Sequence, residues 1–213
     1  MKTFSIVTAL AIAIGGAACA SGSGAAGSAV AAAGAPAVEP ASATIGAPAP
    51  AFTLPDAAGQ PVKLSDFAGK VVVLEWVNPD CPFVKRHADA GTMRSLAQKY
   101  QGKVVWLGIN STNYMDSAAN AKWIAERSLP YPVLDDHTGA VGHAYNAKTT
   151  PHMYVIDTTG KLVYAGAIDD DNAGTKGASA VNYVDAALAE ITAGKPVSVA
   201  ETKPYGCSVK YAK

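Results

Sequence analysis

The apolar positions along the chain fall into short runs that predict alternating strands and helices. Two continuous apolar stretches, at 71–77 and 104–110, have the length and composition of strands buried on both faces. Two later runs, at 152–156 and 162–167, are joined by a polar turn that ends in Gly160, which predicts an antiparallel hairpin. Apolar residues at helical spacing predict helices from Cys81 to Tyr100 and over 116–128, 139–145 and 180–193.

The order of these elements predicts an α/β fold with one mixed central sheet. Helical crossovers place successive strands parallel, whereas the late hairpin adds antiparallel strands, and helices cover both faces. A small β-hairpin over 52–54 and 61–64 is expected as an N-terminal extension, because short apolar pieces alternate there with Gly and Pro. The C-terminal tail at 196–213 shows no obvious regular structure.

The first twenty residues have the layout of a secretory signal peptide. One basic residue, Lys2, precedes an apolar run at 4–14, which is too short to span a bilayer permanently, and small residues follow around Cys19. Two processing routes stay open: cleavage at the small-x-small motif of residues 18–20, or lipidation of Cys19 at a bacterial lipobox. Either route predicts export to the bacterial cell envelope, in the periplasm, with a lipid on Cys19 as the only membrane contact.

Composition delimits the domain and excludes one class of partner. Residues 21–43 are rich in Ala, Gly, Ser and Pro, which predicts a disordered linker before one domain at 44–195. The chain has 17 basic and 17 acidic side chains with no long run of either sign. A nucleic-acid partner would need a concentrated basic face, so none is expected.

Cysteine usage indicates thiol chemistry. Once Cys19 is processed or lipidated, Cys81 and Cys207 remain, and two thiols in an exported chain can form one disulfide. Cys81 is expected at the first turn of a helix, where unpaired N–H groups and the helix dipole stabilise a thiolate. A buried, inert Cys81 is the alternative.

The residues that follow Cys81 suit a reactive thiol. Pro82 is tolerated at the first helical position, because it has no N–H group to lose. The basic triplet Lys85, Arg86 and His87 adds positive potential near the sulfur, although some of its members must point outward on a helix.

Two short motifs carry a resemblance to a known family. The order of elements is similar to the thioredoxin fold, and roughly residues 46–195 resemble the thioredoxin-like redoxin superfamily of the AhpC/TSA type. The motifs "CPFVK" at 81–85 and "GCSVKY" at 206–211 resemble a peroxiredoxin-like subgroup that pairs them. The resemblance implies a thiol oxidoreductase with Cys81 as nucleophile and Cys207 as resolving thiol, joined in a Cys81–Cys207 disulfide.

The resemblance also assigns residues around the nucleophile. Val84 stands where a Cys-x-x-Cys motif has its second cysteine. Pro151 matches the family's cis-proline, which leaves the Thr150 carbonyl available for pairing with an extended substrate. Glu75 falls where thioredoxins carry a buried acid that moves a proton. Burial would raise its pKa, although a partly exposed Glu75 paired with a lysine is an equal alternative.

The peroxiredoxin motif Pro-x-x-x-Thr/Ser-x-x-Cys is absent, because Leu74 and Asn78 occupy its first two defined positions. Efficient peroxidase activity is therefore not implied. Trp76 and Asn78 are expected to flank the site. Asn78 is expected to form a turn before Pro79, with a hydrogen bond to a thiolate or peroxide as the other interpretation.

These assignments predict an exported, peroxiredoxin-like thiol-disulfide oxidoreductase that acts on disulfides or peroxides. An external dithiol, either a thioredoxin-type protein or a small thiol, would reset it, and no bound cofactor or metal is required. One alternative is a non-catalytic binding module whose static Cys81–Cys207 bridge stabilises the fold by roughly 2 to 4 kcal/mol. Another is a copper site that includes Cys81, His87, His152 and Met153.

Overall fold

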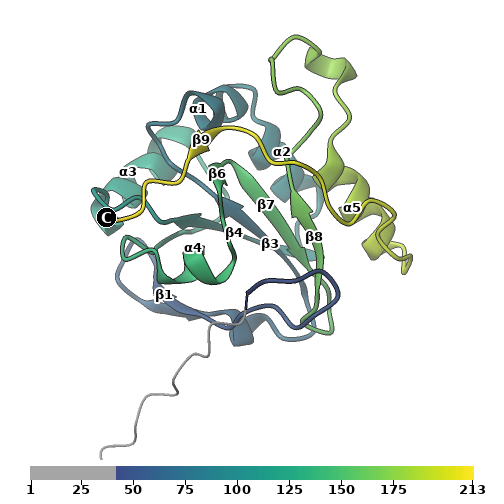
Figure 1. Cartoon of the computed structure of the whole chain (residues 1–213), viewed down its shortest axis with the longest axis horizontal. Coiled ribbons are helices and arrows are strands. Elements are labelled where there is room, and N and C mark those ends of the chain that lie inside the picture. Colours follow the sequence, from purple (N-terminus) through teal and green to yellow (C-terminus); the bar gives the residue numbers. More distant parts are fainter. Residues whose placement is uncertain (1–41) are drawn as a thin grey trace, which may run out of the picture. The chain divides into compact units, whose positions relative to one another are not determined.

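The computed structural model describes residues 42–213 as a five-stranded sheet with helices around it (Figure 1). The elements in chain order are β1 (Thr53–Pro55), β2 (Pro61–Lys63), the 3₁₀ helix η1 (Leu64–Phe67), β3 (Val71–Trp76), α1 (Pro82–Asp89), α2 (Thr92–Lys99), β4 (Val104–Asn110), α3 (Ser117–Arg127), β5 (Val133–Asp135), α4 (Ala140–Ala144), β6 (Thr149–Thr150), β7 (His152–Ile156), β8 (Leu162–Gly166), the 3₁₀ helix η2 (Gly177–Ser179), α5 (Tyr183–Thr192) and β9 (Cys207–Ser208).

The sheet is mixed, as the element order predicts. Its strand order is β5-β4-β3-β7-β8, with β3, β4 and β5 parallel and with β7 and β8 antiparallel to their neighbours. Every residue of the central strand β3 is buried, which explains its continuous apolar sequence. The carboxyl end of β3 leads directly into the loop that carries Cys81 and then into α1.

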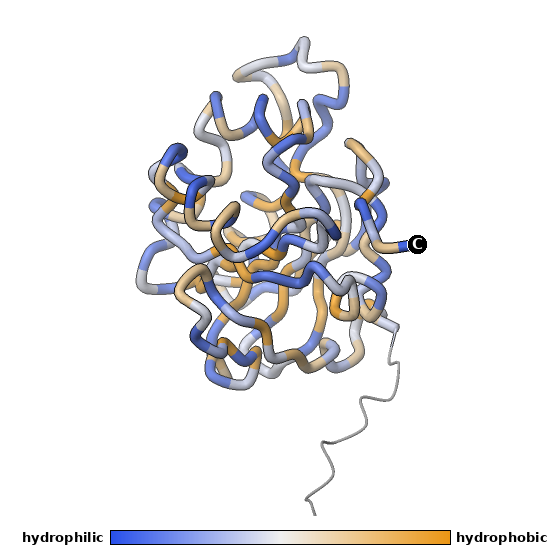
Figure 2. Tube along the Cα trace, turned by 90° about the vertical axis from the view of Figure 1, so that its left-hand side faces the viewer, coloured by the Kyte–Doolittle hydropathy of each residue, from blue (hydrophilic) through white to orange (hydrophobic). Residues whose placement is uncertain are grey.

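Each face of the sheet has its own apolar cluster. Alternate residues of β3 point to opposite faces, so Val71 and Val73 lie in one cluster and Val72, Leu74 and Trp76 in the other. Helices α2 and α5 complete the first cluster, whereas α4 and the β1–β2 hairpin complete the second. Figure 2 shows hydrophobic stretches through the middle of the described part and hydrophilic residues at its outer loops.

The helix expected from Cys81 to Tyr100 is in fact two helices. Helix α1 ends at Asp89, and Gly91 has a φ of 68°, a left-handed conformation that suits glycine and separates α1 from α2. The apolar spacing continues across this break, so the sequence pattern alone predicts one helix. The strand β5, which has only three residues, is too short to give a periodic signal. The other predicted strands and helices end within three residues of their expected limits.

The C-terminal tail differs most from the expectation of no regular structure. Its strand β9 pairs antiparallel with β6, with Cys207 opposite Thr150. Further upstream the tail pairs with β8, where the Thr202 N–H group donates to the Ala165 carbonyl at 3.1 Å. The tail therefore lies docked along the domain, and Figure 1 shows it crossing from α5 to β6.

The N-terminal predictions fall largely outside the described residues. The signal peptide at 1–20, Cys19 and its lipidation, and all but the last two residues of the linker at 21–43 precede residue 42. Within the linker's end, the Ala43 N–H group donates to the Ala144 carbonyl. Between residues 42 and 213, none of the helices has the length and apolar character needed to cross a bilayer.

Candidate active site

Cys81 lies at the N-terminal end of α1, immediately after the sheet. It is the N-cap residue, and Pro82 occupies the first helical position, as predicted. Asn78 forms the turn before it: its side-chain oxygen accepts from the Asp80 N–H group at 2.8 Å, and its carbonyl accepts from the Cys81 N–H group at 2.9 Å. The loop thus fixes Cys81, whose exposed fraction is only 2%.

The tail brings Cys207 into contact with Cys81. Both cysteines are free thiols in this structure, and Cys207 packs against the buried cluster that contains Cys81. The Cys81 thiol also donates to the Thr150 carbonyl, with 3.0 Å between sulfur and oxygen. Thr150, Cys81 and Cys207 therefore form one compact group at the junction of β6, β9 and α1.

The environment makes the two thiols unequal acids. Burial opposes ionisation of Cys81, but contacts with the side chains of Cys207 and Thr150 and with the backbone N–H groups of Val84 and Cys207 lower its pKa below the ordinary value. Burial and the neighbouring Cys81 raise the pKa of Cys207 to about 11. The pair therefore has one sulfur suited to be a thiolate and one suited to be a thiol.

Two residues beside the thiols have features that the sequence pattern did not indicate. Among residues 42–213, the buried Thr150 hydroxyl has no partner with ordinary hydrogen-bond geometry, although its side chain lowers the Cys81 pKa. Gly206 has a φ of 135°, and a Cβ atom there would lie 2.2 Å from the Thr150 carbonyl oxygen. Only glycine therefore allows the tail to approach Thr150 so closely. The Thr150–Pro151 peptide bond is cis, as predicted.

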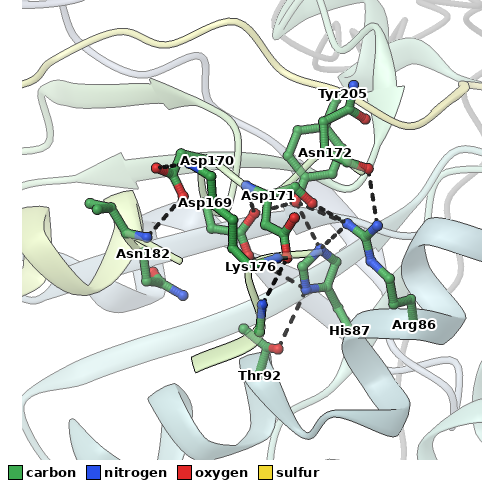
Figure 3. Close-up of polar contacts among 12 residues, drawn as sticks. Arg86, His87, Thr92, Asp169, Asp170, Asp171, Asn172, Lys176, Asn182 and Tyr205 are labelled. Atoms are coloured by element: carbon green, nitrogen blue, oxygen red, sulfur yellow. Dashed lines mark hydrogen bonds and ion pairs between the residues drawn. The ribbon is translucent and has the colours of Figure 1, made fainter. Parts of the chain in front are cut away.

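A polar cluster holds the tail just before Cys207 (Figure 3). The Tyr205 hydroxyl donates to the Asp169 carboxylate, lies 3.0 Å from Nε2 of His87 and accepts from Arg86 at 3.3 Å. Arg86 also donates to both carbonyls of residues 171–172. These contacts tie α1 and the loop after β8 to the tail, two residues before Cys207.

Glu75 is buried, so the interpretation with an exposed, lysine-paired acid is wrong. Its carboxylate accepts from Nε1 of Trp106 and from the Tyr131 hydroxyl, each at 3.0 Å. Burial raises its pKa to about 7, although the two hydrogen bonds oppose the rise. Glu75 lines a small cavity together with Val84, which in turn packs against Cys81. Val84, which stands in place of a second cysteine, therefore borders both the cavity beside Glu75 and the cluster that contains Cys81.

With this geometry established, the chain can be compared with known proteins. Residues 45–165, more than half of the chain, match the model of the AhpC/TSA family. The chain belongs to the AhpC/TSA family.

The relatives of this AhpC/TSA protein include thiol-disulfide oxidoreductases of the ResA and DsbE type. The thiol:disulfide interchange protein DsbE of Pseudomonas fluorescens is 32% identical over 130 residues, which are 59% of this chain and 69% of that protein. ResA of Bacillus thuringiensis is 29% identical, over 56% of this chain and 67% of the relative. An uncharacterised conserved protein from Geobacillus kaustophilus has a TM-score of 0.72 at 31% identity, over 79% of this chain and 93% of that structure. The fold is therefore thioredoxin-like.

Several predicted residues of this AhpC/TSA site lie away from the sulfurs. Trp76 points to the opposite face of the sheet from Glu75, where its indole donates to Ser111 at 3.0 Å. Lys85 is exposed on α1, and Arg86 is engaged by the tail cluster. Burial lowers the pKa of His87, which opposes a positive charge there. Little of the positive potential predicted from the basic triplet therefore acts on the Cys81 sulfur.

The residues of the copper alternative do not form one cluster. His152 lies on β7, where it accepts a hydrogen bond from the Lys148 N–H group at 3.3 Å, and burial lowers its pKa to about 4. Met153 is fully buried in the first apolar cluster. Over the range 42–213, no group of three or more His, Cys, Asp or Glu side chains is arranged to hold a metal ion.

Proposed function

We propose that this protein is an exported thiol-disulfide oxidoreductase in which Cys81 is the nucleophile and Cys207 the resolving thiol. The observation that carries the proposal is that Cys207 of the C-terminal tail packs beside Cys81, with the pKa of Cys81 lowered and the pKa of Cys207 raised. A structural disulfide needs no such difference in pKa between its cysteines, whereas stepwise thiol-disulfide exchange needs a thiolate to start it. Export to the periplasm, with or without a lipid on Cys19, rests on the N-terminal sequence.

The reaction has two exchange steps. The Cys81 thiolate attacks one sulfur of a substrate disulfide, forms a mixed disulfide and releases the other substrate sulfur as a thiolate. Cys207, once deprotonated, attacks the Cys81 sulfur, which releases the second substrate thiolate and leaves a Cys81–Cys207 disulfide. The substrate is reduced and the protein is oxidised by two electrons. An external dithiol, either a protein of the thioredoxin type or a small thiol, then reverses the change.

Glu75 is proposed as the group that exchanges a proton during resolution. Its pKa of about 7 lets it take up and release a proton near neutral pH. It contacts the cavity behind Val84 rather than a sulfur, so it would act on the site from within the core.

A peroxide is the second candidate substrate, and the burial of Cys81 favours it. Cys81 is 2% exposed, and a small molecule can reach such a buried residue more easily than a protein disulfide can. The thiolate would attack one peroxide oxygen, giving a sulfenic acid and releasing water or an alcohol. Cys207 would then condense with the sulfenic acid, releasing water and forming the same disulfide.

The test uses a disulfide that reports each step. The reduced wild-type protein is mixed with an aromatic disulfide whose thiolate is coloured, and two coloured thiolates per protein are expected. Cys207→Ser should release one and retain an aryl adduct on Cys81, whereas Cys81→Ser should react at least ~100-fold more slowly, because its remaining thiol ionises poorly. The same variants are tested with hydrogen peroxide.

The non-catalytic module predicts a different outcome. A reduction potential below about −300 mV, with no thiol-dependent turnover of disulfide or peroxide, would indicate a structural bridge and reject the enzyme proposal.

A further inference from the structure

We propose that the external thiol that resets the oxidised protein attacks the sulfur of Cys207, so that the transient mixed disulfide forms on the tail and Cys81 leaves. This inference rests on the proposed function, because it requires a reducible Cys81–Cys207 disulfide. It assigns the site of entry for the reductant, whose chemical class is a thiolate.

Access favours attack on the tail. A thiolate approaches a disulfide sulfur from the side opposite the leaving sulfur. Cys81 is only 2% exposed and lies within the buried cluster of Val77, Val84 and Trp123, which leaves little room for such an approach. Cys207 packs at the edge of the same cluster but is partly exposed, and the exposed Ser208 follows it.

The leaving group favours the same direction. The sulfur that departs as the more stable thiolate leaves faster. Burial opposes ionisation of Cys81, but the side chains of Cys207 and Thr150 and the backbone N–H groups of Val84 and Cys207 lower its pKa below the ordinary value. Burial and the neighbouring Cys81 raise the pKa of Cys207, which opposes its ionisation. Cys81 is therefore the better leaving group of the two cysteines.

Charge around the tail suits an anionic reductant. Lys210 lies on the exposed side of the tail, where its ammonium group donates to the Ser208 hydroxyl at 3.2 Å. Its charge acts on Cys207, because it favours the thiolate there. The same charge favours the approach of an incoming thiolate.

The external thiol reduces the Cys81–Cys207 disulfide in two exchange steps. The external thiolate forms a bond to the Cys207 sulfur, and the Cys81–Cys207 bond breaks with its electron pair on Cys81. A second thiolate, from the same dithiol or from another molecule, attacks the external sulfur of the mixed disulfide and releases Cys207. The external thiols are oxidised to a disulfide and the protein returns to two thiols.

The experiment identifies the cysteine that carries the adduct. Wild-type protein is oxidised with diamide, and mass spectrometry first checks that Cys81 and Cys207 are linked. It is then exposed briefly to glutathione as the probe, quenched with N-ethylmaleimide at several short times and mapped by peptide mass. We expect glutathione on Cys207 and maleimide on Cys81, in at least ~10-fold excess over the reverse pattern when extrapolated to zero time.

Two other results are distinguishable. An adduct on Cys81, or equal adducts on both cysteines, overturns this inference while leaving the redox-active pair intact. Failure of oxidation to link the two cysteines contradicts the proposed function itself, and this inference with it. Lys210→Gln should slow the glutathione step about 2–3-fold, whereas Lys103→Gln, an exposed lysine after α2, should leave it unchanged.

Discussion

The two cysteines lie side by side, yet they belong to different kinds of structure. Cys81 is fixed by β3, by the Asn78 turn and by the start of α1, all of which are part of the buried domain. Cys207 reaches the same point from a tail that is held by a two-residue strand and a few side-chain contacts. The core side supplies a stable, acidic thiol, and the tail side supplies a thiol whose position depends on a small number of weak attachments.

This difference indicates how the two sides should respond to substitution. Changes on the core side should alter the stability of the domain or the acidity of Cys81. Changes on the tail side should leave the fold intact and slow only the step in which Cys207 meets Cys81. The following predictions test that separation, from the largest expected effect to the smallest.

On the core side, Glu75→Gln should change how stability depends on pH. Folding raises the pKa of Glu75 from 4.5 to about 7, so the native state holds a proton that the unfolded state releases in this range. The wild type should have its full stability below pH 4.5 and lose it as the pH rises to 7. The loss is about 3 kcal/mol, at about 1.4 kcal/mol per pKa unit, which exceeds 100-fold in the unfolding constant.

The Glu75→Gln variant cannot ionise and should not show this loss. Urea unfolding of both reduced proteins at several pH values across this range measures the difference. The titration of His152 is common to both proteins and cancels. If the wild type and the variant lost stability equally as the pH rises, the raised pKa of Glu75 would be contradicted.

On the tail side, Gly206→Ala should slow formation of the internal disulfide about 30-fold, since an overpacked contact costs about 2 kcal/mol. The added Cβ atom would lie 2.2 Å from the Thr150 carbonyl oxygen and push Cys207 away. Release of the second coloured thiolate measures this step. Gly59→Ala is the matched control, because Gly59 also has a positive φ, of 77°, but nothing lies within 4 Å of its Cβ position. Equal rates in both variants would contradict the role of close approach.

Tyr205→Phe should slow the same step about tenfold, because it removes hydrogen bonds to ionised groups worth roughly 1.5 kcal/mol. The first thiolate release, which depends on Cys81, should be unchanged. Tyr114→Phe is the control, since Tyr114 lies outside the tail and is 60% exposed. An equal effect on both release steps would show that Tyr205 only supports the fold.

The smallest effect is expected at the Thr150 hydroxyl. Thr150→Val should raise the Cys81 pKa, because the Thr150 side chain lowers it, and should slow alkylation at a pH below that pKa about threefold. The pH dependence of iodoacetamide alkylation at Cys81, followed by peptide mapping, measures the shift. Thr150→Ser keeps the hydroxyl and should titrate like the wild type. A shift in the serine variant as large as that in the valine variant would assign the effect to the lost methyl group.

Much of the domain follows from local sequence patterns. The runs at 71–77 and 104–110 contain enough apolar residues in sequence to specify buried strands, and the turn before Gly160 specifies a hairpin. The start of α1 at Pro82 and the turn at Asn78 are also local, because proline and asparagine impose backbone preferences on their neighbours. These local patterns are enough to predict that Cys81 lies at the start of a helix.

The contacts between distant segments have no comparable local pattern in the sequence. Burial of Glu75 between Trp106 and Tyr131 depends on residues from three separate segments, so the sequence left its exposure undecided. The cluster around Tyr205 likewise joins α1, the loop after β8 and the tail. A two-residue strand such as β9 has no periodicity to detect, and its pairing exists only because β6 presents an open edge beside it.

The sequence by itself determined the mixed α/β domain, the position of Cys81 at a helix start and the presence of one other thiol outside the N-terminal segment. Only the tertiary structure decided that Cys207 is docked against Cys81, that their pKa values diverge, and that the tail covers the Thr150 edge. The physical reason is that acidity and contact depend on burial and on hydrogen bonds between distant segments, which no local pattern encodes.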